Sequence, residues 1–451
     1  MGIFLNIRFT PETNLIRMQS VKKKIAFHTL GCKLNFSETS YMSNQEEALE
    51  FEHVDFDETA DIYVINSCSV TRKAEKKCRR LIKQALKRNP EAHIAITGCY
   101  SQINPDELQK TEGVNIVLGN ADKFNLFEHI KKLENNNEVD FDAGAREIAV
   151  NKPETFIPVY SSDDRTRTFF KIQDGCDYFC TYCTIPMARG RSRSHTIEET
   201  LKTAARIAET NSKEVVLTGV NIGDFGKRND ESFYELLKEL SAVNGLERIR
   251  ISSIEPNLLT DEMIELVAEK NNLMPHFHIP LQSGADEILK NMGRRYDTSV
   301  FASRVNKIHQ TLPHACIAVD LIVGFPGETD IIFEESARFL KSLPVSYLHV
   351  FTYSERDNTR AVGMGKSVPG KIRSQRSKIM QKTSEEMKRS FYERCKGLKT
   401  KVLWEKEEFQ GHMFGFTENY IKVKTEFDEK RKNRVDLIAL NHLTDEGVYW
   451  V

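Results

Sequence analysis

The sequence predicts an α/β protein with three folded parts: an N-terminal parallel α/β domain, a central partial (βα)6 barrel and a small C-terminal β-barrel. The first two parts are predicted because apolar, strand-like runs alternate with helical patterns, as they do in parallel sheets. In the central part such units follow one another at intervals of roughly thirty to forty residues, and six of them favour a partial barrel over a closed eight-fold one. The C-terminal tail instead alternates apolar with polar residues, which is typical of β-strands.

The composition is ordinary for a globular chain. Of 451 residues, 40% are hydrophobic and 29% are charged, and the net charge of -1 argues against a general polyanion binder. The nine cysteines are an odd number, and the chain begins without the apolar run of a secretory signal. The sequence therefore predicts a cytoplasmic protein whose thiols bind metal, and no stretch is long enough to predict a membrane partner.

Cysteines follow three of the four strands expected in the first domain. The strands and the cysteines after them are residues 24–30 with Cys32, 61–67 with Cys68, 93–98 with Cys99, and 114–119 with none. The ends of parallel strands gather at one edge of a sheet, where ligands bind, so the three cysteines are expected to converge. Three separate buried cysteines acting as small apolar side chains are the alternative. Their shared position favours a metal site.

The predicted boundaries follow from changes in composition. The parts are a flexible lead at residues 1–21, the first domain at 22–140, a linker at 141–167, the barrel with a trailing helix at 168–395, and the C-terminal domain at 396–451. The expected barrel strands are residues 169–173, 214–218, 248–253, 276–281, 317–323 and 346–352, and a charged helix is expected over 371–399. In such barrels the carboxyl ends of the strands hold the active site.

A loop after the first barrel strand carries Cys176, Cys180 and Cys183, with three and then two residues between them. A metal site closed by protein needs a fourth ligand, which this loop lacks. Three thiolates that hold a 4Fe–4S cluster leave one iron open. A zinc knuckle is the alternative, but the nearest downstream histidine, His195, lies twelve residues beyond Cys183. The spacing therefore favours the cluster. Cys78, Cys316 and Cys395 are expected to be structural.

Basic residues flank both cysteine groups. The candidate RNA contacts are Arg72 and Lys73 beside Cys68, and Arg189, Arg191 and Arg193 just after the cysteine loop. Arg294 with Arg295, and the basic turn at 431–434, are further candidates. Phosphate groups bind such side chains, although a single basic patch is usually a solvated face. Two patches next to cysteine sites favour RNA binding. For the tail, nucleic-acid binding and a solvated charged face are both open.

These motifs resemble the radical S-adenosylmethionine (SAM) methylthiotransferases from about residue 24 to the C-terminus. The matching stretches are TLGCKLN (29–35), INSCSVTRKAEKK (65–77), TGCYSQ (97–102), IQDGCDYFCTYCTIPMARGRSRS (172–194), VVLTGVNIGDFG (215–226), ISSIEP (251–256), PLQSGAD (280–286) and DLIVGFPGET (320–329). The tail is loosely similar to a TRAM domain. The TLGCKLN, SCSVTRKAEKK and ARGRSRS stretches are most similar to the branch acting on N6-threonylcarbamoyladenosine next to the tRNA anticodon.

The resemblance implies a barrel of radical SAM type, two 4Fe–4S clusters and SAM. Cys176, Cys180 and Cys183 would hold the cluster whose open iron binds SAM, and Cys32, Cys68 and Cys99 would hold an auxiliary cluster. Tyr182 would lie against the adenine of SAM, and Gly219 would allow a close backbone approach. Glu255, Gln282 and Asp320 would bind its ribose and methionine groups. No side chain is assigned as an acid or base.

The implied reaction places a methylthio group on C2 of the modified adenosine. The implied partners are a tRNA anticodon stem-loop, an electron donor such as flavodoxin or ferredoxin, and a sulfur source. Because C2 must lie between two clusters, the first domain is expected to dock over the open barrel face. The alternatives are the same chemistry on isopentenyl-adenosine or on a ribosomal protein side chain, and a non-catalytic iron–sulfur or zinc protein that binds RNA.

Overall fold

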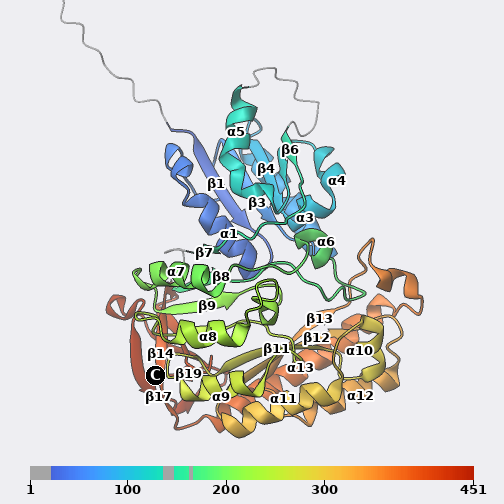
Figure 1. Ribbon diagram of the computed structural model, residues 1–451, viewed down its shortest axis with the longest axis vertical. Helices are drawn as coiled ribbons and strands as arrows, with labels where there is room; N and C mark the ends of the chain where they lie inside the picture. Colours follow the sequence, from blue (N-terminus) through green and yellow to red (C-terminus); the bar gives the residue numbers. More distant parts are fainter. Residues whose placement is uncertain (1–21, 136–146, 162–165) are drawn as a thin grey trace, which may run out of the picture.

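The computed structural model describes residues 22–135, 147–161 and 166–451. Figure 1 shows a smaller N-terminal body lying against a larger one, which contains the barrel and, at one side, the C-terminal sheet. The predicted flexible lead at residues 1–21 lies outside the described residues. Among the described residues, no helix is both long and apolar enough to cross a membrane.

The N-terminal body is a parallel six-stranded sheet in the order β2-β1-β3-β4-β5-β6. Its strands are β1 (Lys24–Thr29), β2 (Glu52–His53), β3 (Ile62–Ser67), β4 (His93–Gly98), β5 (Val114–Leu118) and β6 (Glu147–Ala149). Along β3, Ile62 and Val64 pack into one apolar cluster, and Tyr63 and Ile65 pack into another. The sheet is thus buried on both faces, as parallel sheets require. The four predicted strands are confirmed.

Helices cover both faces of this sheet. They are α1 (Lys33–Ser43), α2 (Arg72–Arg88), α3 (Cys99–Ile103), α4 (Pro105–Gln109) and α5 (Leu126–Asn135), with short 3-10 turns η1 (Glu46–Glu50) and η2 (Asp122–Asn125). The N-cap of α2 is Thr71, whose side chain accepts a hydrogen bond from the backbone of Ala74. Both α1 and α3 begin directly at a predicted metal-binding cysteine.

The described part of the segment 141–167, which the sequence predicts to be a linker, contains two short strands. Within it, β6 pairs with β5 at one edge of the first sheet, and β7 (Val159–Tyr160) pairs antiparallel with the first barrel strand. Sheet edges present unpaired backbone groups, and even two- or three-residue segments pair with them. Strands this short carry no recognisable periodicity in the sequence.

The barrel consists of six parallel strands: β8 (Arg167–Lys171), β9 (Glu214–Thr218), β10 (Ile249–Ile251), β11 (His276–Gln282), β12 (Cys316–Val323) and β13 (Tyr347–Thr352). Isolated parallel bridges, such as Ser253 to His278, join β10 to β11. Among the described strands no ladder joins β13 to β8, so the barrel is open, as predicted. The helices and turns that connect or follow these strands are α6 (Ile185–Arg189), α7 (Ile197–Ala208), η3 (Ile222–Asp224), α8 (Phe233–Ser241), α9 (Asp261–Glu269), α10 (Asp286–Met292), α11 (Thr298–Thr311), α12 (Asp330–Lys341) and η4 (Arg360–Met364).

The C-terminal part is a curled six-stranded sheet in the order β17-β14-β15-β16-β19-β18, built around the buried Trp404. Its elements are β14 (Lys399–Phe409), β15 (His412–Thr417), β16 (Lys422–Glu426), η5 (Glu429–Arg431), β17 (Val435–Ala439), β18 (His442–Leu443) and β19 (Tyr449–Trp450). The helix before it, α13 (Gly370–Arg394), ends earlier than predicted. The chain turns there through Gly397, whose φ of 83° lies in the left-handed region.

Candidate functional site

The cysteines of the loop after β8 line one cavity of about 320 Å³ at the open end of the barrel. Cys176, Cys180 and Cys183 all face it. Of the predicted cofactor contacts, the cavity wall includes Tyr182, Glu255, Gln282 and Asp320. Burial raises the pKa of the Cys176 and Cys183 thiols to about 12, so without metal these thiols are protonated at neutral pH.

The chain that follows the loop holds it in place. Asp174 and Arg193 exchange two backbone hydrogen bonds of 2.9 Å, which bring residues 190–193 against the start of the loop. Gly175 has a φ of 73°, and a Cβ there would lie 2.1 Å from the carbonyl oxygen of Arg191. Only glycine fits between these segments, and Cys176 follows it directly.

The structure shows a packing reason for the glycine at position 219. Gly219 is not among the residues that line the cavity. A Cβ at Gly219 would lie 2.7 Å from Cγ2 of Ile222 and 2.9 Å from Oε1 of Gln173. That oxygen accepts hydrogen bonds from the backbone of Val220 and Asn221, at 2.9 and 2.8 Å. The absence of a side chain at Gly219 therefore makes room for Gln173, and the predicted approach of the cofactor to Gly219 stays a prediction.

Arg294 belongs to this cavity, although the sequence suggested an RNA-binding surface. Its side chain is 4% exposed and forms an ion pair with Glu255. It also donates a hydrogen bond to Sγ of Cys180 at 3.1 Å. Arg294 follows the end of α10 and not a strand, so its position in the sequence carries no signal of a site. Its neighbour Arg295 remains at the surface, 4.3 Å from the ring centre of Tyr178.

The other three predicted cysteine ligands converge at the edge of the N-terminal sheet. Cys32 is the N-cap of α1, Cys68 follows β3, and Cys99 begins α3 after β4. Burial, and then the neighbouring Cys99, raises the pKa of Cys68 to about 12. Gly31 has a φ of 103°, and a Cβ there would lie 2.8 Å from Cβ of Cys68. The close approach of Cys68 thus depends on the glycine that precedes Cys32.

Asn120 lies beside these cysteines and was not predicted. It follows β5, the one strand of the four that no cysteine follows. Its Nδ2 lies 3.7 Å from Sγ of Cys99 and donates to the carbonyl oxygen of Ala188 at 2.8 Å. All four strand ends therefore contribute to the same edge of the sheet, as parallel topology predicts.

A buried network of charges joins the N-terminal body to the barrel. Its anions are Glu38 and Asp174, and its cations are Lys123, Lys171, Arg189 and Arg193. Although burial opposes ionisation, Arg189, Lys123 and Lys171 hold the pKa of Glu38 well below its usual range. Four cations against two anions leave an excess of two positive charges, and Arg189 interacts electrostatically with both Cys32 and Cys99. Such an excess next to three thiols suits a negatively charged group.

Two of the predicted RNA contacts, Arg189 and Arg193, lie in this buried network and not at the surface. Arg189 is 1% exposed, and its guanidinium binds Glu38, Asp174 and the side chain of Asn35. Arg193 is also buried and binds Asp174. Neither side chain can reach a phosphate at the surface, because its donors already bind buried oxygens.

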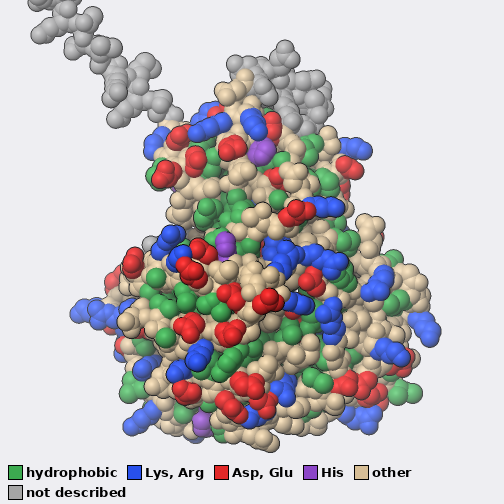
Figure 2. Space-filling model, in the orientation of Figure 1, with side chains coloured by type: hydrophobic (Ala, Val, Ile, Leu, Met, Phe, Trp, Pro, Cys, Tyr) green, Lys and Arg blue, Asp and Glu red, His purple; other side chains and the backbone are tan. Residues whose placement is uncertain are grey.

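The remaining predicted RNA contacts lie at the surface. Arg72 and Lys73 occupy the first turn of α2, and the side chain of Arg72 is 57% exposed. Arg191 is exposed as well and lies 4.5 Å from the ring centre of Phe179. Figure 2 shows Lys and Arg side chains gathered where the N-terminal body meets the barrel.

The N-terminal body forms part of the wall of the cavity of about 320 Å³. Val70 and Thr71, just after Cys68, line that cavity together with Cys183. Thr184 donates a hydrogen bond to the carbonyl oxygen of Ser69 at 3.5 Å. From the barrel side, Arg356 binds Ser69 and Glu75. As expected, the first domain docks over the open barrel face, and residues just after Cys68 reach the cavity that Cys176, Cys180 and Cys183 line.

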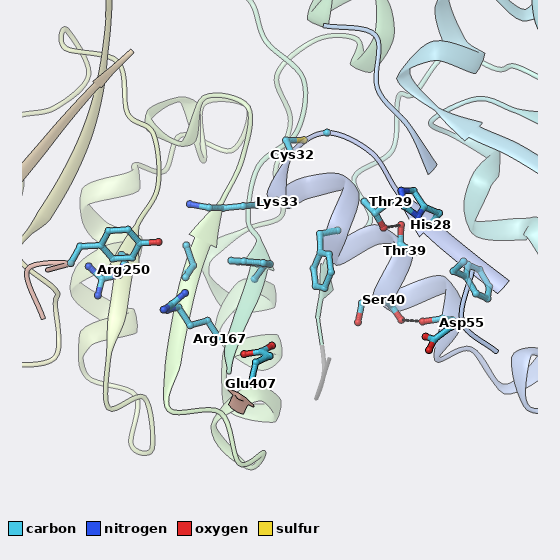
Figure 3. Close-up of a pocket in the computed structure, with 17 residues that line it drawn as sticks. His28, Thr29, Cys32, Lys33, Thr39, Ser40, Asp55, Arg167, Arg250 and Glu407 are labelled. Atoms are coloured by element: carbon cyan, nitrogen blue, oxygen red, sulfur yellow. Dashed lines mark hydrogen bonds between the residues drawn. The ribbon is translucent and has the colours of Figure 1, made fainter. Parts of the chain in front are cut away.

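A second cavity, of about 1030 Å³, lies between all three parts of the chain (Figure 3). The N-terminal body contributes Cys32 and Lys33, and the C-terminal sheet contributes Tyr420. The barrel contributes Arg167 and Phe169 from β8, Val216 from β9 and Arg250 from β10. The neighbours of Val216 and Arg250 along the strands pack into the core on the other side, which follows from the two-residue period of a strand.

Two family models match the chain, and each contains one group of cysteines. The model described as uncharacterized protein family UPF0004 matches residues 24–119, and the radical SAM superfamily model matches residues 170–340.

Curated relatives match most of the chain. The threonylcarbamoyladenosine tRNA methylthiotransferase MtaB of Bacillus subtilis is 39% identical over 406 residues, which cover 88% of this chain and 89% of the relative. The protein of the same name from Thermotoga maritima is 37% identical, over 94% of this chain and 96% of its own length. The chain belongs to the radical SAM methylthiotransferase family. A tRNA-2-methylthio-N(6)-dimethylallyladenosine synthase of Rickettsia canadensis is more distant, at 30% identity over 88% of this chain and 92% of that protein.

The fold of this methylthiotransferase also matches solved radical SAM structures. The radical SAM methyltransferase TsrM from Kitasatospora setae, with cobalamin and a [4Fe-4S] cluster bound, has a TM-score of 0.54. The match covers 87% of this chain and 80% of that one at 14% identity, which shows a shared fold. The predicted radical SAM barrel is confirmed, and the non-catalytic alternative is excluded by the family.

The cavity of the methylthiotransferase suits the cofactors that its superfamily implies, a 4Fe–4S cluster and SAM. Three soft sulfur donors lie at one end, which is the ligand type that iron–sulfur clusters require. Glu255, Gln282 and Asp320 offer polar groups for a small molecule beside them. The volume of about 320 Å³ lies at the lower end of the usual range for ligand sites.

Proposed function

We propose that this enzyme transfers a methylthio group to C2 of N6-threonylcarbamoyladenosine next to the anticodon of tRNA. The observation that carries the proposal is that one group of three cysteines lines the cavity at the open barrel end, while Val70 and Thr71, just after Cys68 of the second group, form part of the wall of the same cavity. The names of relatives that are 37 to 39% identical support the substrate. The isopentenyl-adenosine alternative corresponds to relatives at 30% identity.

Each cysteine group is proposed to hold one 4Fe–4S cluster. Cys176, Cys180 and Cys183 would hold the one beside SAM, and Cys32, Cys68 and Cys99 the auxiliary one. The excess of two buried positive charges beside the second group supports a negatively charged cluster there. When bound, these groups supply the radical, the methyl group and the sulfur.

The chain itself supplies binding and orientation. Tyr182 is proposed to contact the adenine of SAM, because its ring faces the cavity and packs edge-on against Phe325. Glu255, Gln282 and Asp320 would bind the ribose and methionine groups. Arg294 would act as a positioning residue, since it binds both Glu255 and the sulfur of Cys180. Hydrogen bonds to cluster sulfurs also shift reduction potentials.

Each of the three parts of the chain is proposed to bind a different ligand. Residues 22–140 would bind the auxiliary cluster, 168–395 the radical cluster, and 396–451 RNA. The anticodon stem-loop would contact Arg72, Lys73 and Arg191 at the junction, and binding would weaken as salt increases. A cytoplasmic setting, an electron donor such as flavodoxin or ferredoxin, and a sulfur source complete the proposal.

Anaerobic reconstitution of a cysteine variant tests the proposal. The wild-type protein should bind about eight irons per chain, and Cys180→Ala should retain about four. This variant should no longer cleave SAM reductively, whereas Cys78→Ala, a buried cysteine of the apolar core, should behave as wild type.

The substrate is tested separately by mass spectrometry of nucleosides from tRNA incubated with the reconstituted enzyme. The 2-methylthio form of threonylcarbamoyladenosine should accumulate. Methylthiolation of only isopentenyl-adenosine, or of no nucleoside, would show that the proposed substrate is wrong. Cleavage of SAM by Cys180→Ala would instead refute the assignment of the radical cluster.

A further inference from the structure

The cavity of about 1030 Å³ contains a lysine that forms no ion pair with a described residue. Lys33 follows Cys32 directly, and Figure 3 shows its side chain extending from the start of α1 toward the barrel strands. Its ammonium group is accessible from the cavity, and the structure shows no ion pair or hydrogen bond between it and a described residue. Lys33 is exposed to this cavity, so its ammonium group is free to meet the negative charge of a ligand that enters it.

The other cations of this cavity have partners. Arg250 binds Glu214 through Nε at 2.7 Å and donates to the carbonyl oxygen of Glu418 at 3.0 Å. Arg167 binds both Glu214 and Glu405. These guanidinium groups therefore attach the C-terminal sheet to the barrel and are not free to bind a ligand. Lys33 differs from them because no described carboxylate lies within ion-pair distance of it.

The carboxylates that line the cavity lie away from Lys33. In Figure 3, Glu407 is beside Arg167 and Asp55 is beside Ser40, whereas Lys33 is at the opposite edge, next to Cys32. A lysine in the first turn of α1 does not stabilise the helix either. The helix dipole favours acidic residues there, and α1 has none. The stability of α1 therefore does not explain why a lysine stands at position 33.

The surroundings of Lys33 suit a small organic acid more than a bare phosphate. Phe36, Phe169, Val216 and Tyr420 form apolar and aromatic walls of the same cavity. Cys32 places the proposed auxiliary cluster at the edge of the cavity. A ligand whose negative charge meets Lys33 would therefore place its other end near the proposed sulfur source.

We propose that Lys33 binds the carboxylate of the threonylcarbamoyl group and thereby selects acid-bearing adenosines. This inference rests on the proposed function, in which the base that receives the methylthio group carries that carboxylate on N6. Lys33 would contact the substrate without taking part in the chemistry. An adenosine with an uncharged N6 substituent would leave the ammonium group unpaired in the cavity, which disfavours its binding.

The test compares two anticodon stem-loops with the fully reconstituted enzyme. One carries threonylcarbamoyladenosine, and the other carries the same group with its carboxylate converted to the neutral amide. The wild-type enzyme should bind the acid about tenfold to a hundredfold more tightly, the range expected for a hydrogen bond between charged groups. Lys33→Met should lose this preference, and Lys33→Arg should retain most of it.

Two control measurements distinguish a loss of substrate recognition from damage to the cysteine site. Iron content and RNA-independent cleavage of SAM should stay unchanged in Lys33→Met, and Lys378→Met, an exposed lysine of α13, should behave as wild type throughout. If Lys33→Met loses iron, Lys33→Gln replaces it in the comparison. Loss of iron in both variants would overturn the inference, because Lys33 would then serve the cysteine site.

The remaining outcomes distinguish this inference from the proposed function. If the wild-type enzyme methylthiolates the acid substrate but Lys33→Met keeps the full preference for acid over amide, only the role of Lys33 is wrong. An equal affinity of the wild-type enzyme for acid and amide leads to the same conclusion. If the wild-type enzyme does not methylthiolate the acid substrate at all, the proposed function fails and this inference fails with it.

Discussion

The replacement Glu38→Gln should weaken the docking of the N-terminal body on the barrel. The carboxylate of Glu38 is 1% exposed and accepts four hydrogen bonds. They come from Lys123 at 2.5 Å, from Lys171 at 3.1 Å, and from two nitrogens of Arg189 at 3.0 Å each. A glutamine removes the negative charge and offers one acceptor oxygen in place of two, so Asp174 is left as the only anion of the network.

The expected loss follows from the burial of these partners. Removing one member of a buried ion pair costs about 3–5 kcal/mol, because the remaining charges stay desolvated without compensation. Glu38 and Lys123 belong to the N-terminal body, whereas Lys171 and Arg189 belong to the barrel. Most of the loss should therefore fall on the contact between the two bodies and not on either core.

Hydrogen exchange and denaturant unfolding together measure this loss. In Glu38→Gln, amides of α1 and β8 should exchange faster, and the unfolding midpoint should fall. The control is Glu265→Gln, whose ion pair with Lys307 at 2.6 Å is exposed and should contribute less than about 1 kcal/mol. A loss in Glu38→Gln as small as in this control, with unchanged exchange at the interface, would refute the reasoning.

Two further predictions concern the cysteine edge and a buried histidine. In Gly31→Ala the new Cβ would meet Cys68, so iron should fall from about eight to about four per chain, whereas Gly363→Ala, with nothing within 4 Å, should keep all of it. Eight irons in Gly31→Ala would contradict this. Burial, and then Arg250, lowers the pKa of His276 well below 6.5, so only the unfolded chain takes up this proton, and stability should decrease as pH falls from about 7 to about 5. In the cluster-free protein, His276→Phe should reduce that decrease in unfolding midpoint, and an unchanged pH dependence would show the assignment is wrong.

Much of the fold was predictable because the relevant signals are local. Apolar runs such as residues 62–67 and 93–98 marked buried strands, and the spacing of Cys176, Cys180 and Cys183 marked a three-thiolate loop within eight residues. The convergence of Cys32, Cys68 and Cys99 needed only one topological rule, since parallel strands end at a common edge. These inferences depend on the order of residues along the chain and on strand direction.

The burial of the charged residues, unlike the strands and the cysteine groups, was not predictable from the sequence. Arg189, Arg193 and Arg294 look like surface cations in the sequence, because burying an unpaired charge is costly and charged residues are mostly exposed. Arg189 pairs with Glu38, and Arg294 pairs with Glu255. These partners are distant in the sequence, so no local pattern predicts the ion pairs.

The sequence by itself therefore determined the strands, the two cysteine groups and the family they resemble. Tertiary structure decided which charges are buried, that the supposed linker extends two sheets, and that Lys33 is left unpaired among the described residues beside Cys32. The physical reason is that strand formation and thiolate spacing are properties of a short segment. The state of a charge depends on which distant groups the folded chain brings to within a few ångströms of it.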